Sequence, residues 1–116
     1  MQWSPDGNFL ASGGQDKKLI IWEAANQEQV ASLGELWVFS IAWSPGGERV
    51  ATGTSRGLVQ IWDLQSGEIV NELKPREISE AISLGWSPDG EFIAEGLLNG
   101  EILIWDAESG RLLNTL

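Results

Sequence analysis

The hydrophobic residues of this chain are gathered in short runs rather than in long stretches. Such runs recur at 9–12, 19–22, 59–62 and 102–105, and residues typical of turns stand between them. None of the runs keeps its apolar positions at the three- and four-residue spacing of an amphipathic helix. The pattern predicts an all-β protein built from short strands.

Tryptophan positions divide these runs into repeats. Six of the seven tryptophans form two series that are offset by 19 residues, with periods of 40 and then 43 residues. The first series is Trp3, Trp43 and Trp86, and the second is Trp22, Trp62 and Trp105. A fixed period of this size is typical of stacked supersecondary units. Three extra residues between Asp63 and Trp86 indicate an insertion there.

Turn residues repeat in phase with the tryptophans. Ser-Pro-Asp-Gly or Ser-Pro-Gly-Gly follows each tryptophan of the first series. Proline presets φ for a tight turn and glycine accepts a positive φ. Each tryptophan of the second series stands in Ile-Trp-Asp or Ile-Trp-Glu, and Ser-Gly turns follow at 66–67 and 109–110. These motifs predict four strands in each repeat.

The two phased motifs, at a period near 40, resemble the WD-repeat (WD40) β-propeller family over essentially the whole chain. The resemblance implies a single domain, 1–116, of about three blades of four antiparallel strands that form an open arc. The expected blades are 1–33, 34–74 and 75–116. The expected strands are Met1–Trp3, Phe9–Gly13, Lys18–Trp22, Glu28–Ser32, Val38–Trp43, Arg49–Gly53, Leu58–Trp62, Glu68–Leu73, Ala81–Trp86, Phe92–Gly96, Glu101–Trp105 and Arg111–Leu116.

The chain departs from the family in having no histidine. In typical WD repeats a histidine binds a loop aspartate and, through a serine or threonine, the tryptophan of the third strand. The serine or threonine position reads Ser12, Thr52 and Glu95 here. We expect two substitute ion pairs, Glu35 with Arg56 in blade two and Arg76 with Glu95 in blade three. The alternative is that these side chains point to water.

Composition excludes several classes of chemistry. Acidic residues outnumber basic ones by 17 to 7, which argues against nucleic acid or an anionic membrane as partner. Without histidine or cysteine there is no Ser-His-Asp triad, thiolate site or disulfide. No phosphate-binding glycine motif and no paired catalytic carboxylates are evident. We therefore expect no enzyme, cofactor or metal, and a cytoplasmic protein, since no membrane span or signal peptide is visible.

The seventh tryptophan, Trp37, stands outside both series, just before the inner strand of blade two. In WD propellers this edge belongs to the top face, where partners commonly bind, and exposed aromatic and arginine residues are favoured interface anchors. Trp37 could instead pack onto the neighbouring blade, whereas the six periodic tryptophans are predicted to lie in the core. The predicted binding residues are Trp37, Phe39, Arg56, Glu80, Ile82, Leu98 and Asn99. The acidic stretch of Glu72, Glu77 and Glu80, with Lys74 and Arg76 inside it, is interpreted as a solvated insertion.

The resemblance implies a non-catalytic scaffold that binds proteins or peptides through this top face. A regulatory or sensor segment of a larger signalling enzyme is the alternative. Since three blades do not close a ring, we expect a fragment of a longer propeller, with further blades in the same chain. Assembly of copies into a ring is the second possibility, and light scattering distinguishes the two.

Overall fold

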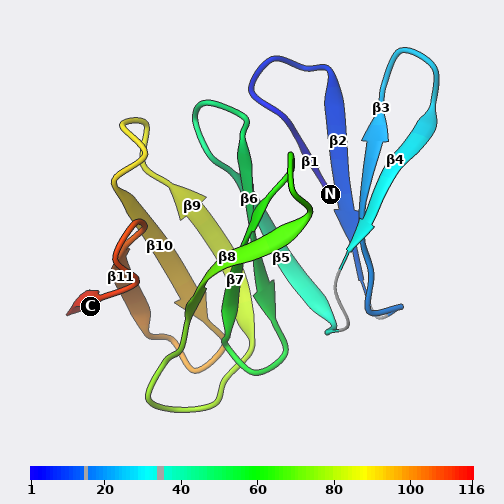
Figure 1. Cartoon of the computed structure of the whole chain (residues 1–116). Helices are drawn as coiled ribbons and strands as arrows, with labels where there is room; N and C mark the ends of the chain where they lie inside the picture. The colour runs from blue at the N-terminus through cyan, green and yellow to red at the C-terminus, as the bar shows by residue number, and fades with distance from the viewer. Residues whose placement is uncertain (15, 34–35) are drawn as a thin grey trace.

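The computed structural model describes residues 1–14, 16–33 and 36–116, and these form twelve strands and no helix. The strands make three antiparallel sheets of four, which stand side by side (Figure 1). Within each sheet, strands that follow one another in the sequence are neighbours. The all-β prediction and the open arc of four-stranded WD-type blades are confirmed.

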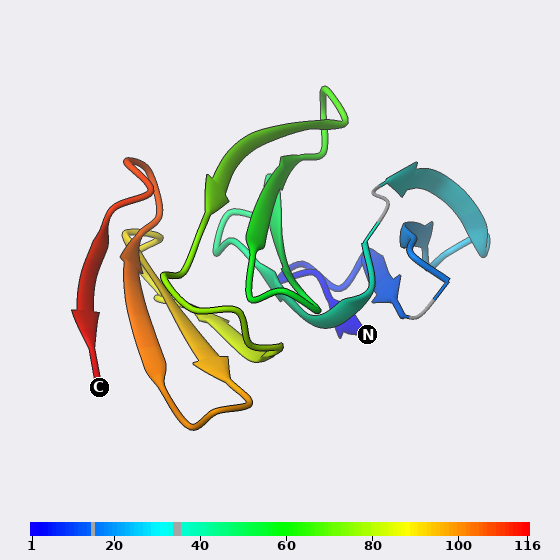
Figure 2. The ribbon, with the colours of Figure 1, turned by 90° about the horizontal axis from the view of Figure 1, so that it is seen from below.

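Each sheet is a meander from an inner strand to an outer strand. The first sheet contains β1 (Gln2–Trp3), β2 (Phe9–Gly13), β3 (Leu19–Glu23) and β4 (Glu28–Leu33). The second contains β5 (Val38–Trp43), β6 (Arg49–Thr54), β7 (Val59–Asp63) and β8 (Glu68–Leu73). The third contains β9 (Ala81–Trp86), β10 (Phe92–Leu97), β11 (Ile102–Asp106) and β12 (Leu112–Thr115). Figure 2, which looks along the strands, shows the sheets fanned out with β4, β8 and β12 at the outside.

The predicted strand bounds are wrong by one residue at several ends. The third strand of each sheet begins and ends one residue later than expected. The end moves because the acidic residue after the tryptophan joins the ladder. Asp63, for example, is paired with Arg49 in the antiparallel register. The strands β4, β6 and β10 extend one residue further than predicted, and β12 is one residue shorter at each end.

The predicted tight turns form between the first and second strands of each sheet. Gly7 has a φ of 77°, and its N–H donates to the Ser4 carbonyl at 2.9 Å. The Ser4 hydroxyl accepts the Phe9 N–H at 3.0 Å, which ties the turn to the start of β2. Gly47 and Gly90 repeat the positive φ in the other two sheets. A serine and a glycine at fixed spacing thus set the hairpin geometry.

Apolar side chains fill the two spaces between neighbouring sheets. Those between the second and third sheets include Ala51, Val59, Ile61, Ile93 and Leu103, all fully or almost fully buried. Burying one such aliphatic side chain contributes about 1.5–3 kcal/mol relative to exposure. These two interfaces therefore hold the three sheets together, since a single sheet cannot cover its own apolar face.

Two glycines allow neighbouring sheets to approach closely. A Cβ at Gly13 would lie 2.7 Å from the Cβ of Val38, and one at Gly53 would lie 2.8 Å from that of Ala81. Val38 and Ala81 are the first residues of β5 and β9. Gly96 stands at the equivalent place in the third sheet, where a Cβ would meet only Ser83 of the same sheet, at 3.4 Å. Within the described part of the chain, this face of the third sheet has no covering sheet.

The prediction that all six periodic tryptophans lie in the core is wrong for one of them. Trp43, Trp62 and Trp105 are buried, and Trp22 and Trp86 are half-buried. Trp3, however, is 56% exposed. It lies in the first sheet on a face over which no other described sheet packs, and burial of these tryptophans depends on a neighbouring sheet.

Candidate functional site

The predicted binding residues gather toward one end of the sheets, here called the top face. It is formed by residues 16–18, 36–37, 55–58, 74–80 and 98–101, which belong to turns and to the connections between sheets. This end lies at the bottom of Figure 1 and faces the viewer in Figure 2. The antiparallel order of each sheet brings these segments to the same end, although they are far apart in the sequence.

Backbone hydrogen bonds tie each connection to a turn of the sheet that it enters. The Ser55 N–H donates to the Trp37 carbonyl at 3.2 Å, and the Leu98 N–H donates to the Glu80 carbonyl at 2.9 Å. Trp37 and Glu80 therefore occupy equivalent places. The Trp37 side chain is 39% exposed, so it is partly packed and partly presented to solvent. Asn99 joins the same group, because its N–H donates to the Ser79 hydroxyl at 3.2 Å.

Phe39 and Ile82 occupy equivalent irregularities in the inner strands. The pairing of β5 with β6 skips Phe39, and that of β9 with β10 skips Ile82. Such bulges redirect a side chain away from the ladder, and these two side chains are 43% and 48% exposed. The Ser40 hydroxyl donates to the Ala81 carbonyl at 2.8 Å, so the two bulged segments lie on adjacent strands.

Sequence reasoning missed an exposed apolar residue of the top face. Ile78, in the connection between β8 and β9, is 81% exposed. Its signal was an isolated apolar residue within an otherwise polar insertion. Leu98, in the neighbouring turn, is also exposed, and so is Arg56 in the turn of the second sheet.

Inside each sheet, the tryptophan of the third strand donates to a polar side chain of the second strand. Trp22 Nε1 lies 3.0 Å from Ser12 Oγ, and Trp62 Nε1 lies 3.2 Å from Thr52 Oγ1. Trp105 Nε1 donates to Glu95 Oε2 at 2.9 Å. The position that the resemblance assigned to serine or threonine therefore accepts the indole N–H in all three sheets.

Glu95 is the unusual member of this set. Its side chain is 0% exposed, and its second oxygen, Oε1, has no hydrogen-bond partner among the residues that the structure describes. Burial raises the pKa of this carboxyl to about 7, against the lowering effect of the hydrogen bond from Trp105. Both protonation states are therefore populated near neutral pH.

The predicted ion pair between Arg76 and Glu95 is wrong. Within the described ranges Glu95 accepts a hydrogen bond from Trp105 alone, whereas Arg76 is exposed and lies in the longer connection between β8 and β9. The three-residue insertion makes this connection longer, so spacing along the sequence does not identify the counterpart of the family histidine in it. The other predicted pair includes Glu35, which lies outside the described residues.

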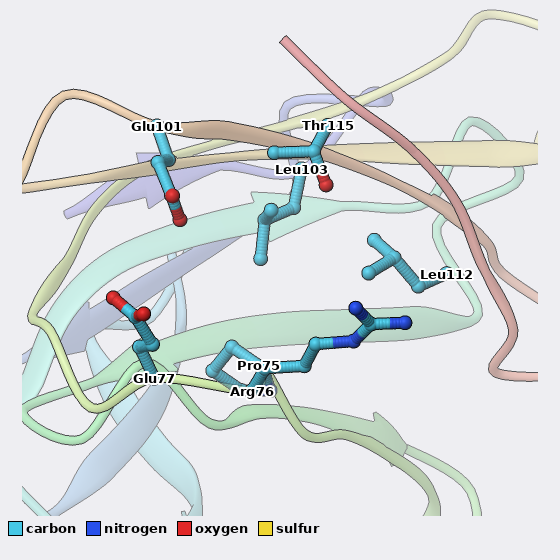
Figure 3. A pocket seen from close by; sticks show the side chains of 7 residues that line it. All are labelled: Pro75, Arg76, Glu77, Glu101, Leu103, Leu112 and Thr115. Atoms are coloured by element: carbon cyan, nitrogen blue, oxygen red, sulfur yellow. The ribbon is translucent and has the colours of Figure 1, made fainter.

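Arg76 instead belongs to a cavity of about 240 Å³ between the same connection and the third sheet. Figure 3 shows the carboxylates of Glu77 and Glu101 turned toward one another, with the Arg76 guanidinium directed toward Leu112. The interpretation of this stretch as a purely solvated insertion missed the cavity. The lining residues are Pro75, Arg76, Glu77, Glu101, Leu103, Leu112 and Thr115.

Turns at the opposite end of the sheets carry many carboxylates with structural roles. A hydrogen bond from the Ser4 hydroxyl, at 2.6 Å, lowers the pKa of Asp6, and one from the Ser87 hydroxyl does the same for Asp89. The N–H of Ser109 lowers the pKa of Asp106. Among the described residues, no group of three or more histidine, cysteine or acidic side chains could hold a metal ion. None of the described segments is a helix long and apolar enough to cross a membrane.

Comparison with known proteins gives consistent matches. The sequence model of the family described as "Eukaryotic translation initiation factor eIF2A" matches residues 1–96. The chain is 36% identical over 72 residues to "Small ribosomal subunit protein RACK1z" of Arabidopsis thaliana, and 38% identical over 74 residues to the protein of that name in Oryza sativa subsp. japonica. These alignments include 61% and 62% of this chain and 22% of each relative.

A third relative is "Actin-interacting protein 1" of Drosophila melanogaster. It is 30% identical over 76 residues, which are 62% of this chain and 12% of the relative. The chain thus spans about a fifth or less of the length of these relatives.

Proposed function

The chain belongs to the family described as Eukaryotic translation initiation factor eIF2A, a family of WD-repeat propellers, and from this premise we propose that it is a non-catalytic cytoplasmic scaffold whose top face binds proteins or peptides. The relatives are WD40 proteins, and their names connect them with a ribosomal subunit and with actin. Actin is a protein and a ribosomal subunit contains proteins, which supports protein partners for this chain.

The observation that carries the proposal is the group of exposed apolar side chains at the top face and the adjacent bulges. Trp37, Phe39 and Ile82 are each about two-fifths to one-half exposed. Aromatic side chains at interfaces are the commonest anchors, because each removes a large apolar area from water when a partner covers it. Arg56, exposed in the turn beside the Trp37 connection, adds a donor that suits a carboxylate or carbonyl of a partner.

The backbone at two of the predicted positions is hydrogen-bonded to a neighbouring turn. The bonds from Ser55 to Trp37 and from Leu98 to Glu80 hold these two residues against the turns. Binding to such a surface costs less conformational entropy than binding to a mobile loop. A rigid presentation of apolar side chains is what a scaffold requires.

The test compares the proteins that this chain captures from a cytoplasmic extract with those captured by two variants. We expect Trp37→Ala to lose specific partners, with a reduction of about tenfold or more in capture. The matched control is Leu113→Ala, which removes an exposed apolar side chain from the outer strand β12. Circular dichroism and urea unfolding check that both variants keep the fold.

Equal capture by Trp37→Ala and Leu113→Ala would contradict top-face binding. Hydrolytic or transferase activity of the chain, abolished by substitution of a single carboxylate, would contradict the non-catalytic assignment and favour a segment of an enzyme.

A further inference from the structure

The cavity beside the third sheet is lined in part by the longer connection between β8 and β9. Seven residues, 74–80, connect β8 to β9, whereas four residues, 34–37, connect β4 to β5. The longer connection supplies Pro75, Arg76 and Glu77 to the lining. The remaining wall comes from the start of β11 and from β12, so the cavity lies between the insertion and the top-face end of the third sheet.

One end of the cavity carries two carboxylates. Glu77 comes from the connection and Glu101 from the turn before β11, and their carboxylates face one another (Figure 3). Two opposed carboxylates fit a compact cation that is placed between them. An ammonium group suits this arrangement better than a planar guanidinium, which prefers to make two parallel bonds to a single carboxylate.

Three apolar residues form one part of the cavity wall. Leu103 is buried, Leu112 is half-buried, and Pro75 closes the side formed by the connection. A lysine side chain matches this combination, because its four methylene groups pack against apolar surface while its ammonium remains with charged partners. A volume of about 240 Å³ admits one such side chain rather than a folded domain.

Arg76 makes the two ends of the cavity differ in charge. Its guanidinium is directed toward Leu112, away from the two carboxylates (Figure 3). A cation is therefore repelled from the Arg76 end and attracted to the Glu77 and Glu101 end. The guanidinium also offers N–H donors to a carbonyl or carboxylate next to the bound lysine in the partner.

We propose that this cavity binds a lysine side chain of a protein partner, with the ammonium between Glu77 and Glu101 and the aliphatic stem along Leu103. The proposal rests on the function proposed above, since it describes how the scaffold recognises one residue of what it binds. It adds a charged contact to the apolar anchors of the top face.

The experiment titrates the full 116-residue chain, labelled with ¹⁵N, with Nα-acetyl-lysine amide at physiological ionic strength and records backbone amide shifts. We expect saturable shifts at residues 75–77 and 101–103. The same probe acetylated on Nε, which keeps the stem and loses the charge, should bind about tenfold more weakly or worse. The double variant Glu77→Gln, Glu101→Gln should lose binding similarly, whereas Glu108→Gln, an exposed acid at the opposite end, should not.

Three results would overturn the proposal. They are equal binding of the Nε-acetylated probe, unchanged binding in the double variant with well-dispersed amide signals, or shifts concentrated in the acidic turns at the opposite end, which would indicate general attraction of cations. If the lysine probe fails while capture of partners still depends on Trp37, this inference falls and the scaffold proposal stands.

Discussion

The second and third sheets make the same internal contact with different chemistry. In the second sheet Trp62 donates to the hydroxyl of Thr52, which is itself 3.4 Å from the Gln60 carbonyl. In the third sheet Trp105 donates to the carboxyl of Glu95, whose other oxygen has no partner in the described part of the chain. In both sheets this position supplies an acceptor for the indole N–H. The kind of acceptor decides whether the sheet responds to pH.

The largest expected effect comes from removing the tryptophans. Trp62→Ala and Trp105→Ala should each lower the free energy of unfolding by about 3–5 kcal/mol, because both side chains are buried. Trp105→Ala also leaves Glu95 without its one donor, so its loss should be greater at pH 8 than at pH 5. Urea unfolding followed by far-UV circular dichroism measures both. If the loss of unfolding free energy depended equally on pH in the two variants, the distinction between the sheets would be contradicted.

An intermediate effect is expected from pH alone. The pKa of Glu95 rises from 4.5 to about 7 in the folded chain, so the folded state binds more protons than the unfolded state between these values. Stability is therefore highest below about pH 4.5 with respect to this group and falls as the pH rises through 7, by roughly 1–3 kcal/mol. Asp6, Asp89 and Asp106 act in the opposite direction and only at lower pH, because their pKa values are lowered.

The variant Glu95→Thr gives the third sheet the chemistry of the second. Its unfolding free energy should be nearly constant between pH 5 and pH 8, in contrast to that of the original chain. Parallel curves for the two chains would show that another group causes the pH dependence.

The smallest effect is expected at Arg76. The Arg76 side chain lies in the cavity and not beside Glu95. Arg76→Gln should therefore leave unchanged the pH at which the decrease in unfolding free energy is half complete. It should alter the unfolding free energy by less than about 0.5 kcal/mol. A shift of this midpoint by half a pH unit or more would support an ion pair between Arg76 and Glu95 and would contradict the structure. The measurement is the same urea series, with Lys74→Gln as the matched control.

The repeated structure was predictable because local chemistry determines it. Proline and glycine after Trp43 dictate a tight turn, and the same spacing in each repeat gives the same hairpin. The resemblance also pointed to Ser12, Thr52 and Glu95 as the residues that meet the tryptophans. These features depend on residues near one another in one sheet, so the sequence pattern was sufficient.

The remaining features depend on how sheets and connections lie against one another. Trp3 carries the same motif as Trp43 but is exposed, since burial depends on a neighbouring sheet rather than on the motif. The path of residues 74–80 cannot be read from their composition, and both the cavity and the failure of the Arg76 pairing follow from that path. Ile78 was missed for the same reason.

Gly13, Gly53 and Gly96 are not among the glycines with a positive φ, so their own backbone does not demand glycine. At Gly13 and Gly53 the requirement comes from the first residue of the next inner strand, and at Gly53 it comes also from the hydroxyl of Ser40 in the same sheet. Such a glycine is required because a neighbouring residue leaves no room for a side chain. Where no neighbour is present, as around Gly96 in the described chain, tolerance to alanine becomes a property of context rather than of the residue. The same substitution can then be silent in one setting and disruptive in another.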